Sequence, residues 1–317
     1  MTRQGGRLIL VPLDGSRAAA LALGAARTLS HSAGAVLHTL HVCRRRLPSD
    51  RLWAALGMPP DFLSDVVLDQ AVGRPEREIP EAASALGAEL LVITTHGRTY
   101  DLARPAGHVA LSVLQRAPCP VLVVRSALGK AGAKKLDHVG RILVPLDGSP
   151  EATACVGHAA DLARRNDAEL CFLHVATAGR AFPRRRAVLS APRYLDQPYL
   201  EMETWSEEFL ARCLGFERQA RLGVPLRLFL TCGEPGGEIV RFAAKHACDL
   251  IVAAWAGRLR GERAKVVKAL LKRTPCPLLF LRCSARLKNP LTYDCSDCAL
   301  LDESRQTRSP GDSPVRG

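Results

Sequence analysis

The chain has 317 residues, of which 47% are hydrophobic and 24% are charged, and its formal net charge is +13. These values are typical of a globular protein of about two domains, and no apolar run approaches the ~20 residues of a membrane span. Aromatic residues make up only 5% and no basic recognition helix is visible, so the charge indicates general attraction of anions and not nucleic-acid binding.

The first half of the chain alternates between predicted strands and helices. Leu8–Leu13 is a continuous apolar run, the pattern of a strand buried on both faces. Asp14-Gly-Ser16 turns the chain, and Ser16 is placed to cap a helix that continues to about Ser30. Further strands are expected at Val36–Val42, Val66–Val72, Leu90–Thr94 and Val121–Val124. Helices are expected over Pro75–Leu86 and Gly107–Arg116, and a short turn is expected around Asp50–Leu56.

The second half repeats the first, because Ile9–Ser16 recurs letter for letter as Ile142–Ser149. A repeat unit this long is a duplicated domain. Ser149 and Pro150 predict the cap and first position of a helix. The remaining elements are expected as strands at Glu169–Val175, Leu226–Thr231, Leu250–Ala254 and Leu278–Leu281, and as helices from Pro235 to about His246 and over Glu262–Arg273.

These patterns predict an α/β protein with two units, each a five-stranded parallel sheet flanked by helices. We expect a first domain at 1–125, a linker at 126–140, a second domain at 141–283 with an inserted segment at about 178–223, and a disordered tail at 284–317. The two units are expected to keep separate sheets and to pack through their last strands, at Pro120–Val124 and Pro277–Leu281, because those apolar edges would otherwise stand open.

Ligands of open parallel sheets bind beyond the carboxyl ends of the strands. Asp14 and Asp147 follow the first strand of each half, where a carboxylate can accept hydrogen bonds from an adenine amino group or a ribose hydroxyl. Thr94–Gly97 and the helix start at Gly107-His108 can bring backbone N–H groups against phosphate. The alternative is that both aspartates only shape turns and that both glycines only permit them.

Taken together, Val-Pro-Leu-Asp-Gly-Ser, Gly73-Arg-Pro75, the Thr-His-Gly turn and the closing Pro-Cys-Pro-Val-Leu-Val-Val resemble the universal stress protein (UspA) family. The resemblance covers about residues 7–125 and 141–282. It implies two tandem Rossmann-like domains of the adenine nucleotide alpha hydrolase type, a role in the stress response, and binding of ATP or a related adenine nucleotide.

The resemblance also implies which residues would hold the nucleotide. The expected binding residues are Pro12, Leu13, Asp14, Val42, Ile93, Thr94, His96, Gly97, Gly107, His108 and Val109 in the first half, and Asp147 and Gly257 in the second.

The phosphate motif of the nucleotide-binding members, Gly-x-x-Gly, nine residues, then Gly-Ser/Thr, is incomplete in both halves. The first half has Tyr100 for the second glycine and His108 for the hydroxyl residue, and its segment is three residues shorter. The second half has Ala264-Lys265 for Gly-Ser/Thr, with Trp255 expected beside the loop, where it would obstruct phosphate. Arg258, Arg260, Arg263 and Lys265 either attract phosphate or form a solvated face.

No nucleophile–base set and no metal-ligand pattern is evident, so we expect neither an enzyme nor a metal protein. The cysteines are interpreted as buried reduced thiols in a cytoplasmic protein, and Cys295/Cys298 as an incidental pair rather than a zinc or redox motif. Two main functions stay open: a sensor that binds an adenine nucleotide, chiefly in the first domain, and an interaction protein that keeps the fold without a ligand. A third, which rests only on the net charge, is a factor associated with anions or nucleic acid. The sequence leaves homo-oligomerisation open.

Overall fold

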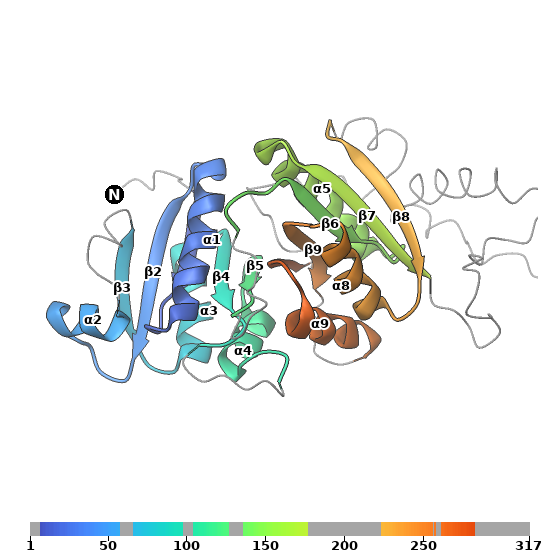
Figure 1. Cartoon of the computed structure of the whole chain (residues 1–317). Coiled ribbons are helices and arrows are strands. Elements are labelled where there is room, and N and C mark those ends of the chain that lie inside the picture. Colours follow the sequence, from blue (N-terminus) through green and yellow to red (C-terminus); the bar gives the residue numbers. More distant parts are fainter. Residues whose placement is uncertain are drawn as a thin grey trace, which may run out of the picture.

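A computed structural model of the chain describes residues 7–57, 66–97, 104–126, 136–176, 223–255, 257 and 261–282 (Figure 1). Nearly all of the expected insertion, the whole expected tail and the Cys295/Cys298 pair lie outside the described residues. No helix among the described residues is both long and apolar enough to cross a membrane.

Ten strands form one sheet in the order β3-β2-β1-β4-β5-β10-β9-β6-β7-β8. Each half contributes five parallel strands in the same relative order, 3-2-1-4-5, which is a doubly wound arrangement. The strands are β1 (Leu8–Pro12), β2 (Val36–Cys43), β3 (Val67–Val72), β4 (Leu90–Thr94), β5 (Val121–Val124), β6 (Arg141–Pro145), β7 (Glu169–Ala176), β8 (Leu226–Cys232), β9 (Leu250–Trp255) and β10 (Leu278–Arg282).

The helices cover the sheet in two layers, each packed on its own hydrophobic cluster. One cluster contains residues of α1 (Arg17–Ala33), α2 (Ser49–Leu56) and α5 (Pro150–Asn166). The other contains residues of α3 (Pro75–Leu86), α4 (His108–Arg116), α8 (Pro235–Lys245) and α9 (Glu262–Arg273). Both clusters include residues from both halves, so on each face of the sheet the hydrophobic core continues from one half into the other.

Helix α1 and its counterpart α5 begin as the sequence predicts. Ser16 Oγ accepts a hydrogen bond of 3.1 Å from the N–H of Ala19, and Ser149 Oγ accepts one of 3.2 Å from the N–H of Ala152. Pro150 occupies the first turn of α5, where its missing N–H would have had no intrahelical partner. These caps fix where the chain leaves the carboxyl ends of β1 and β6.

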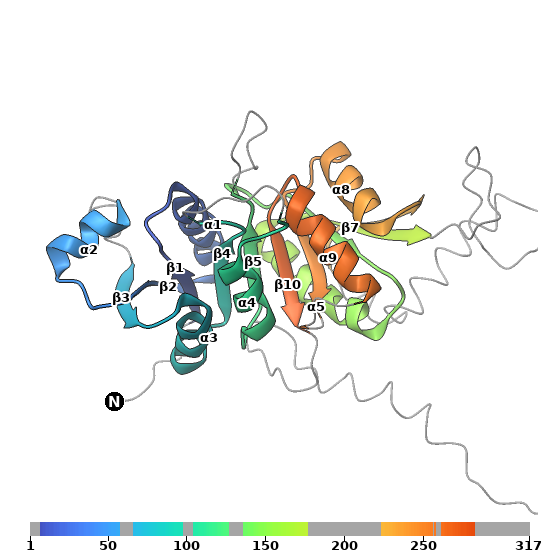
Figure 2. The same ribbon diagram turned by 90° about the horizontal axis from the view of Figure 1, so that it is seen from below.

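The halves meet at β5 and β10, which pair antiparallel in the middle of the sheet (Figure 2). The prediction that the halves pack through their last strands is confirmed, with Leu279 opposite Leu122. The expectation of two separate sheets is wrong. Strand β5 is buried along its whole length, so edge pairing satisfies backbone groups that would otherwise be buried without partners.

Long side chains at the ends of β5, β9 and β10 tie the halves together across this junction. Arg125 Nη1 donates to the carbonyl of Thr274 at 2.9 Å, and Arg282 Nη1 donates to the carbonyl of Ala117 at 3.3 Å. These two bonds are equivalent under the approximate two-fold relation of the halves. The Trp255 indole N–H also donates to the carbonyl of Leu114 in the first half, at 2.9 Å.

The seven cysteines among the described residues are free, as the sequence predicts, and five of them are buried. Burial raises the pKa of Cys119 and of Cys248 to about 12 and that of Cys171 to about 11. These thiols are therefore protonated at neutral pH and act as small hydrophobic side chains.

Candidate functional site

The carboxyl ends of β1 and β4 lie side by side because these two strands pair in the sheet. The residues that follow them, Asp14 and Gly97, come into direct contact. A Cβ atom added to Gly97 would lie 2.1 Å from Oδ2 of Asp14, far inside van der Waals distance. A side chain at this position would force the Asp14 carboxylate to move, so in this structure the carboxylate lies against the bare backbone of Gly97 at the carboxyl ends of β1 and β4.

Asp14 also shapes the turn after β1, as the alternative interpretation proposed. Its Oδ1 accepts a hydrogen bond of 2.9 Å from the N–H of Ser16. The equivalent Asp147 makes the same bond to the N–H of Ser149, at 3.0 Å, and a second to the Ser149 hydroxyl. The environments differ, because Asp14 is half-buried and Asp147 is exposed.

The loop after β4 is held by a serine that the sequence analysis assigned only to the linker. The Ser126 hydroxyl lies 3.0 Å from Thr95 Oγ1 and accepts a 3.0 Å bond from the N–H of His96. The N–H of Ser126 donates in turn to Thr95 Oγ1 at 3.1 Å, and Thr94 Oγ1 donates to the carbonyl of His96. The loop is therefore fixed against the end of β5. A lone serine after a strand gives no signal for this role in one sequence.

Helix α4 begins beside this loop, but Gly107 does not act as the sequence suggested. Its N–H donates to the carbonyl of Thr95 at 2.7 Å and so holds the helix to the loop, instead of facing a phosphate. The first intrahelical bond runs from Leu111 to Gly107, so the N–H groups of residues 108–110 point out of the helix end. His108 is exposed at this electropositive end.

The other expected residues of the first half are partly or fully buried near the same ends of the strands. Leu13, Ile93 and His96 are buried, whereas Pro12, Thr94, Val42 and Val109 are half-buried, the two valines packing against the cluster under α3 and α4.

Two histidines that the sequence analysis missed hold the first turn in each half. His41 Nδ1 lies 2.8 Å from the carbonyl of Leu13, and His174 Nδ1 lies 2.8 Å from the carbonyl of Leu146. Their equivalent positions in the repeat are the only signal that could have identified them.

In the second half, the expected obstruction by Trp255 is wrong. Its side chain is 3% exposed and points into the junction, where it donates to Leu114, because a large apolar ring is more stable there than in solvent. Gly257 has φ +72°, and a Cβ there would lie 3.0 Å from Arg282 Nη2. Ala264 is buried and Lys265 is exposed. Arg258, Arg260 and the side chain of Arg263 lie outside the described residues.

The carboxyl ends of the first-half strands bring together three kinds of group that can contact a polar ligand. A carboxylate can accept from an amino group or hydroxyl, outward N–H groups of α4 can donate to phosphate, and half-buried valines offer apolar surface. Within the described part of the chain, no cluster of three or more His, Cys, Asp and Glu side chains could hold a metal ion.

Comparison with known proteins agrees with the resemblance. The profile of the universal stress protein family matches residues 62–125 and 138–282, which is more than half of the chain. A universal stress protein of Methanocaldococcus jannaschii is 26% identical over 156 residues, which cover 45% of this chain and 81% of that protein.

Two solved structures share the fold along most of the chain. A universal stress protein of Archaeoglobus fulgidus has a TM-score of 0.61 at 14% identity, covering 88% of this chain and 97% of that chain. A functionally unknown protein of Pseudomonas aeruginosa has a TM-score of 0.59 at 20% identity, covering 88% and 93%. This chain belongs to the universal stress protein family, with two family units in tandem.

Proposed function

We propose that the first half of this chain binds ATP or a related adenine nucleotide, and that the protein acts as a nucleotide-responsive module of the stress response. The observation that carries the proposal is the contact between Asp14 and Gly97. It leaves a carboxylate against bare backbone at the edge where doubly wound sheets bind ligands.

In this proposal the nucleotide lies along the edge from Asp14 to α4. Asp14 accepts a hydrogen bond from the adenine amino group or a ribose hydroxyl. The N–H groups of residues 108–110 and the exposed His108 ring donate to the phosphates. Ser126 does not touch the ligand but keeps the loop and helix in position, because it holds Thr95 and His96.

The second half supports the alternative function, a protein-interaction unit. Its Asp147 is exposed and Ala264 stands where the phosphate motif has glycine. We therefore assign the nucleotide to the first half and leave the second half as a candidate partner surface.

The test is a thermal shift titration with ATP on the wild type and on the matched variants Asp14→Asn and Asp147→Asn. Asparagine keeps the oxygen that shapes the turn but replaces the second carboxylate oxygen with a donor. We expect Asp14→Asn to weaken ATP binding about tenfold or more, the effect of losing a charge-assisted hydrogen bond, and Asp147→Asn to leave it unchanged.

Native mass spectrometry of freshly purified protein provides an independent reading, because a bound nucleotide adds its mass to the intact chain. The proposal fails if no nucleotide co-purifies and millimolar ATP produces no thermal shift. Equal losses in the two variants would place binding elsewhere.

A further inference from the structure

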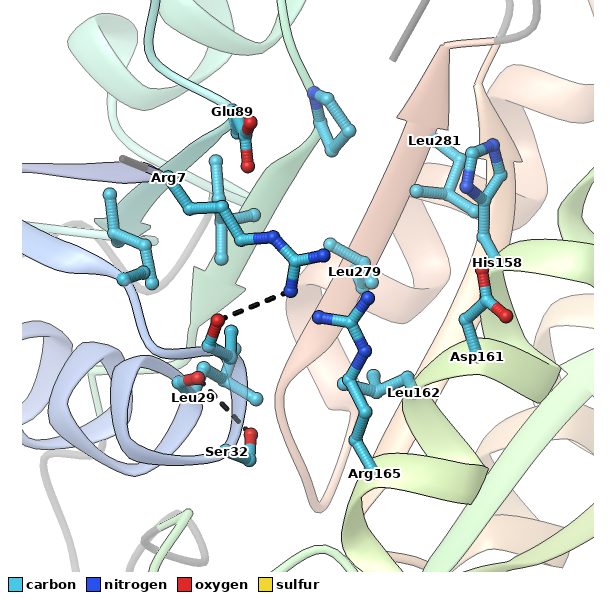
Figure 3. A pocket seen from close by; sticks show the side chains of 15 residues that line it. Arg7, Leu29, Ser32, Glu89, His158, Asp161, Leu162, Arg165, Leu279 and Leu281 are labelled. Atoms are coloured by element: carbon cyan, nitrogen blue, oxygen red, sulfur yellow. Dashed lines mark hydrogen bonds between the residues drawn. The ribbon is translucent and has the colours of Figure 1, made fainter. Parts of the chain in front are cut away.

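A cavity opens between the two halves. It lies at the amino ends of the first-half strands, whereas Asp14 lies at their carboxyl ends. Arg7 precedes β1 and Glu89 precedes β4, so this is the amino end of the parallel strands. Its apolar wall includes Leu29 of α1, Leu162 of α5, and Leu279 and Leu281 of β10, and α5 also contributes the polar side chains of His158, Asp161 and Arg165 (Figure 3). About 680 Å³ of space in it is not filled by protein atoms, and this volume includes open solvent.

The repeat shows that this cavity is a departure from the symmetry of the fold. In the second half, the linker residues Leu136 and Val139, which precede β6, are buried in the cluster that contains residues of α1 and α5, with exposed fractions of 2% and 0%. Thr28 Oγ1 holds the segment by donating to the carbonyl of Leu136. The equivalent sequence positions in the first half are Arg3 and Gly6, which lie outside the described residues and are not apolar. The linker therefore places buried apolar side chains before β6, and the first half has no apolar side chain at the equivalent positions before β1.

The acidic residue just before the fourth strand of each half also has different hydrogen-bond partners in the two halves. Asp249 Oδ2 accepts hydrogen bonds from the N–H groups of Gly140 and Arg141, both at 2.9 Å. Its counterpart Glu89 has a buried oxygen, Oε2, to which no described residue donates. Such an atom costs about 1–3 kcal/mol, so a buried acceptor without a donor points to a missing partner.

The charges around Glu89 restrict what that partner can be. Arg7, which donates to the carbonyl of Ala33 at 3.1 Å, and Arg165 both face the cavity (Figure 3). Burial raises the pKa of Glu89, and the charges of Arg7 and Arg165 oppose that shift. The positive charges of Arg7 and Arg165 are matched by the negative charges of Glu89 and Asp161, which also lines the cavity, so the lining favours neither a cation nor an anion. A neutral ligand with one donor satisfies the carboxylate without adding charge.

We propose that this cavity is a second binding site, for a small, uncharged, mainly apolar molecule that carries one hydroxyl or N–H donor. The apolar body rests on Leu29, Leu279 and Leu281, and the donor binds the carboxylate of Glu89, which lines the cavity. The site is separate from the nucleotide edge and does not depend on the nucleotide proposal.

The experiment compares 2-naphthol with 2-methoxynaphthalene, which has the same rings but no donor, by isothermal titration with the full chain. We expect 2-naphthol to bind at least tenfold more tightly. In Glu89→Met, which has similar length but no acceptor oxygen, that preference should disappear. The variant should unfold at a temperature no lower than the wild type, because it removes the unpartnered carboxylate oxygen.

A blocking variant controls for binding elsewhere. Ser32 lines the cavity and is half-buried, so Ser32→Phe should fill it and abolish binding of both probes while leaving the ATP thermal shift unchanged. The proposal is overturned if neither probe binds, if both bind equally to the wild type, or if Ser32→Phe still binds 2-naphthol.

Discussion

Replacing Trp255 with phenylalanine should weaken the junction between the halves by a measurable amount. The indole N–H donates to the carbonyl of Leu114, and both residues are at most 3% exposed. Leu114 lies in the last turn of α4, where helix carbonyls lack intrahelical partners. Leaving this carbonyl buried and unpartnered costs about 1–3 kcal/mol, and the lost carbon atoms of the ring add roughly 1–1.5 kcal/mol. We expect the free energy of unfolding to fall by about 2–4 kcal/mol.

Urea denaturation followed by circular dichroism measures this change. Because both hydrophobic clusters include residues of both halves, wild type and variant should each unfold in one transition. Phe280→Leu is the matched control, since Phe280 packs on Trp255 with ring centroids 6.0 Å apart but removing its ring breaks no hydrogen bond. It should lose roughly 1–1.5 kcal/mol. A loss for Trp255→Phe below that of the control would refute the reasoning.

Two further predictions concern the loop after β4 and the buried thiols. Ser126→Ala should lower the free energy of unfolding by about 1–2 kcal/mol and speed hydrogen exchange in residues 94–97, because it removes the contacts to Thr95 and His96. Unchanged hydrogen exchange in residues 94–97 would contradict the role assigned to Ser126. The thiol pKa values of Cys119, Cys171 and Cys248 are raised in the folded state, so the folded protein keeps protons above pH 9 that the unfolded chain has lost. Stability should therefore fall as pH rises from about 9 towards 11, more steeply in the wild type than in a variant with alanine at these three positions, and equal slopes would argue against it.

The strands were predictable because parallel strands buried on both faces are continuous apolar runs. Leu90–Thr94 and Val121–Val124 have the predicted bounds, and β1 ends one residue earlier than expected, at Pro12. The caps at Ser16 and Ser149 were predictable because a serine before an apolar-periodic segment satisfies the first N–H groups of a helix. Because the domain is duplicated, the same strand and cap patterns occur in both halves, and each occurrence supports the other.

The junction was only partly predictable. The apolar last strands indicate that the halves meet there, but nothing in the pattern distinguishes two stacked sheets from one continuous sheet. Antiparallel pairing of β5 with β10 depends on edge hydrogen bonds and on cross-half contacts such as that of Trp255. Such contacts join residues more than a hundred positions apart and leave no local periodicity.

The candidate site was predictable in its location but not in its details. That Asp14 and Gly97 lie at one edge follows from strand order, since β1 and β4 are neighbours. The commitment of the Gly107 N–H to Thr95, the fixing of the loop by Ser126 and the orientation of His41 depend on backbone geometry that residue types do not specify.

The most direct test of the central claim is hydrogen–deuterium exchange of the full chain with and without saturating ATP, read by mass spectrometry. If the first half holds the nucleotide, exchange should slow in peptides that cover Asp14–Ser16, residues 94–97 and the start of α4 at residues 108–110, and it should stay unchanged in peptides around Asp147. Slower exchange confined to the second half, or no change at the start of α4, would contradict the account.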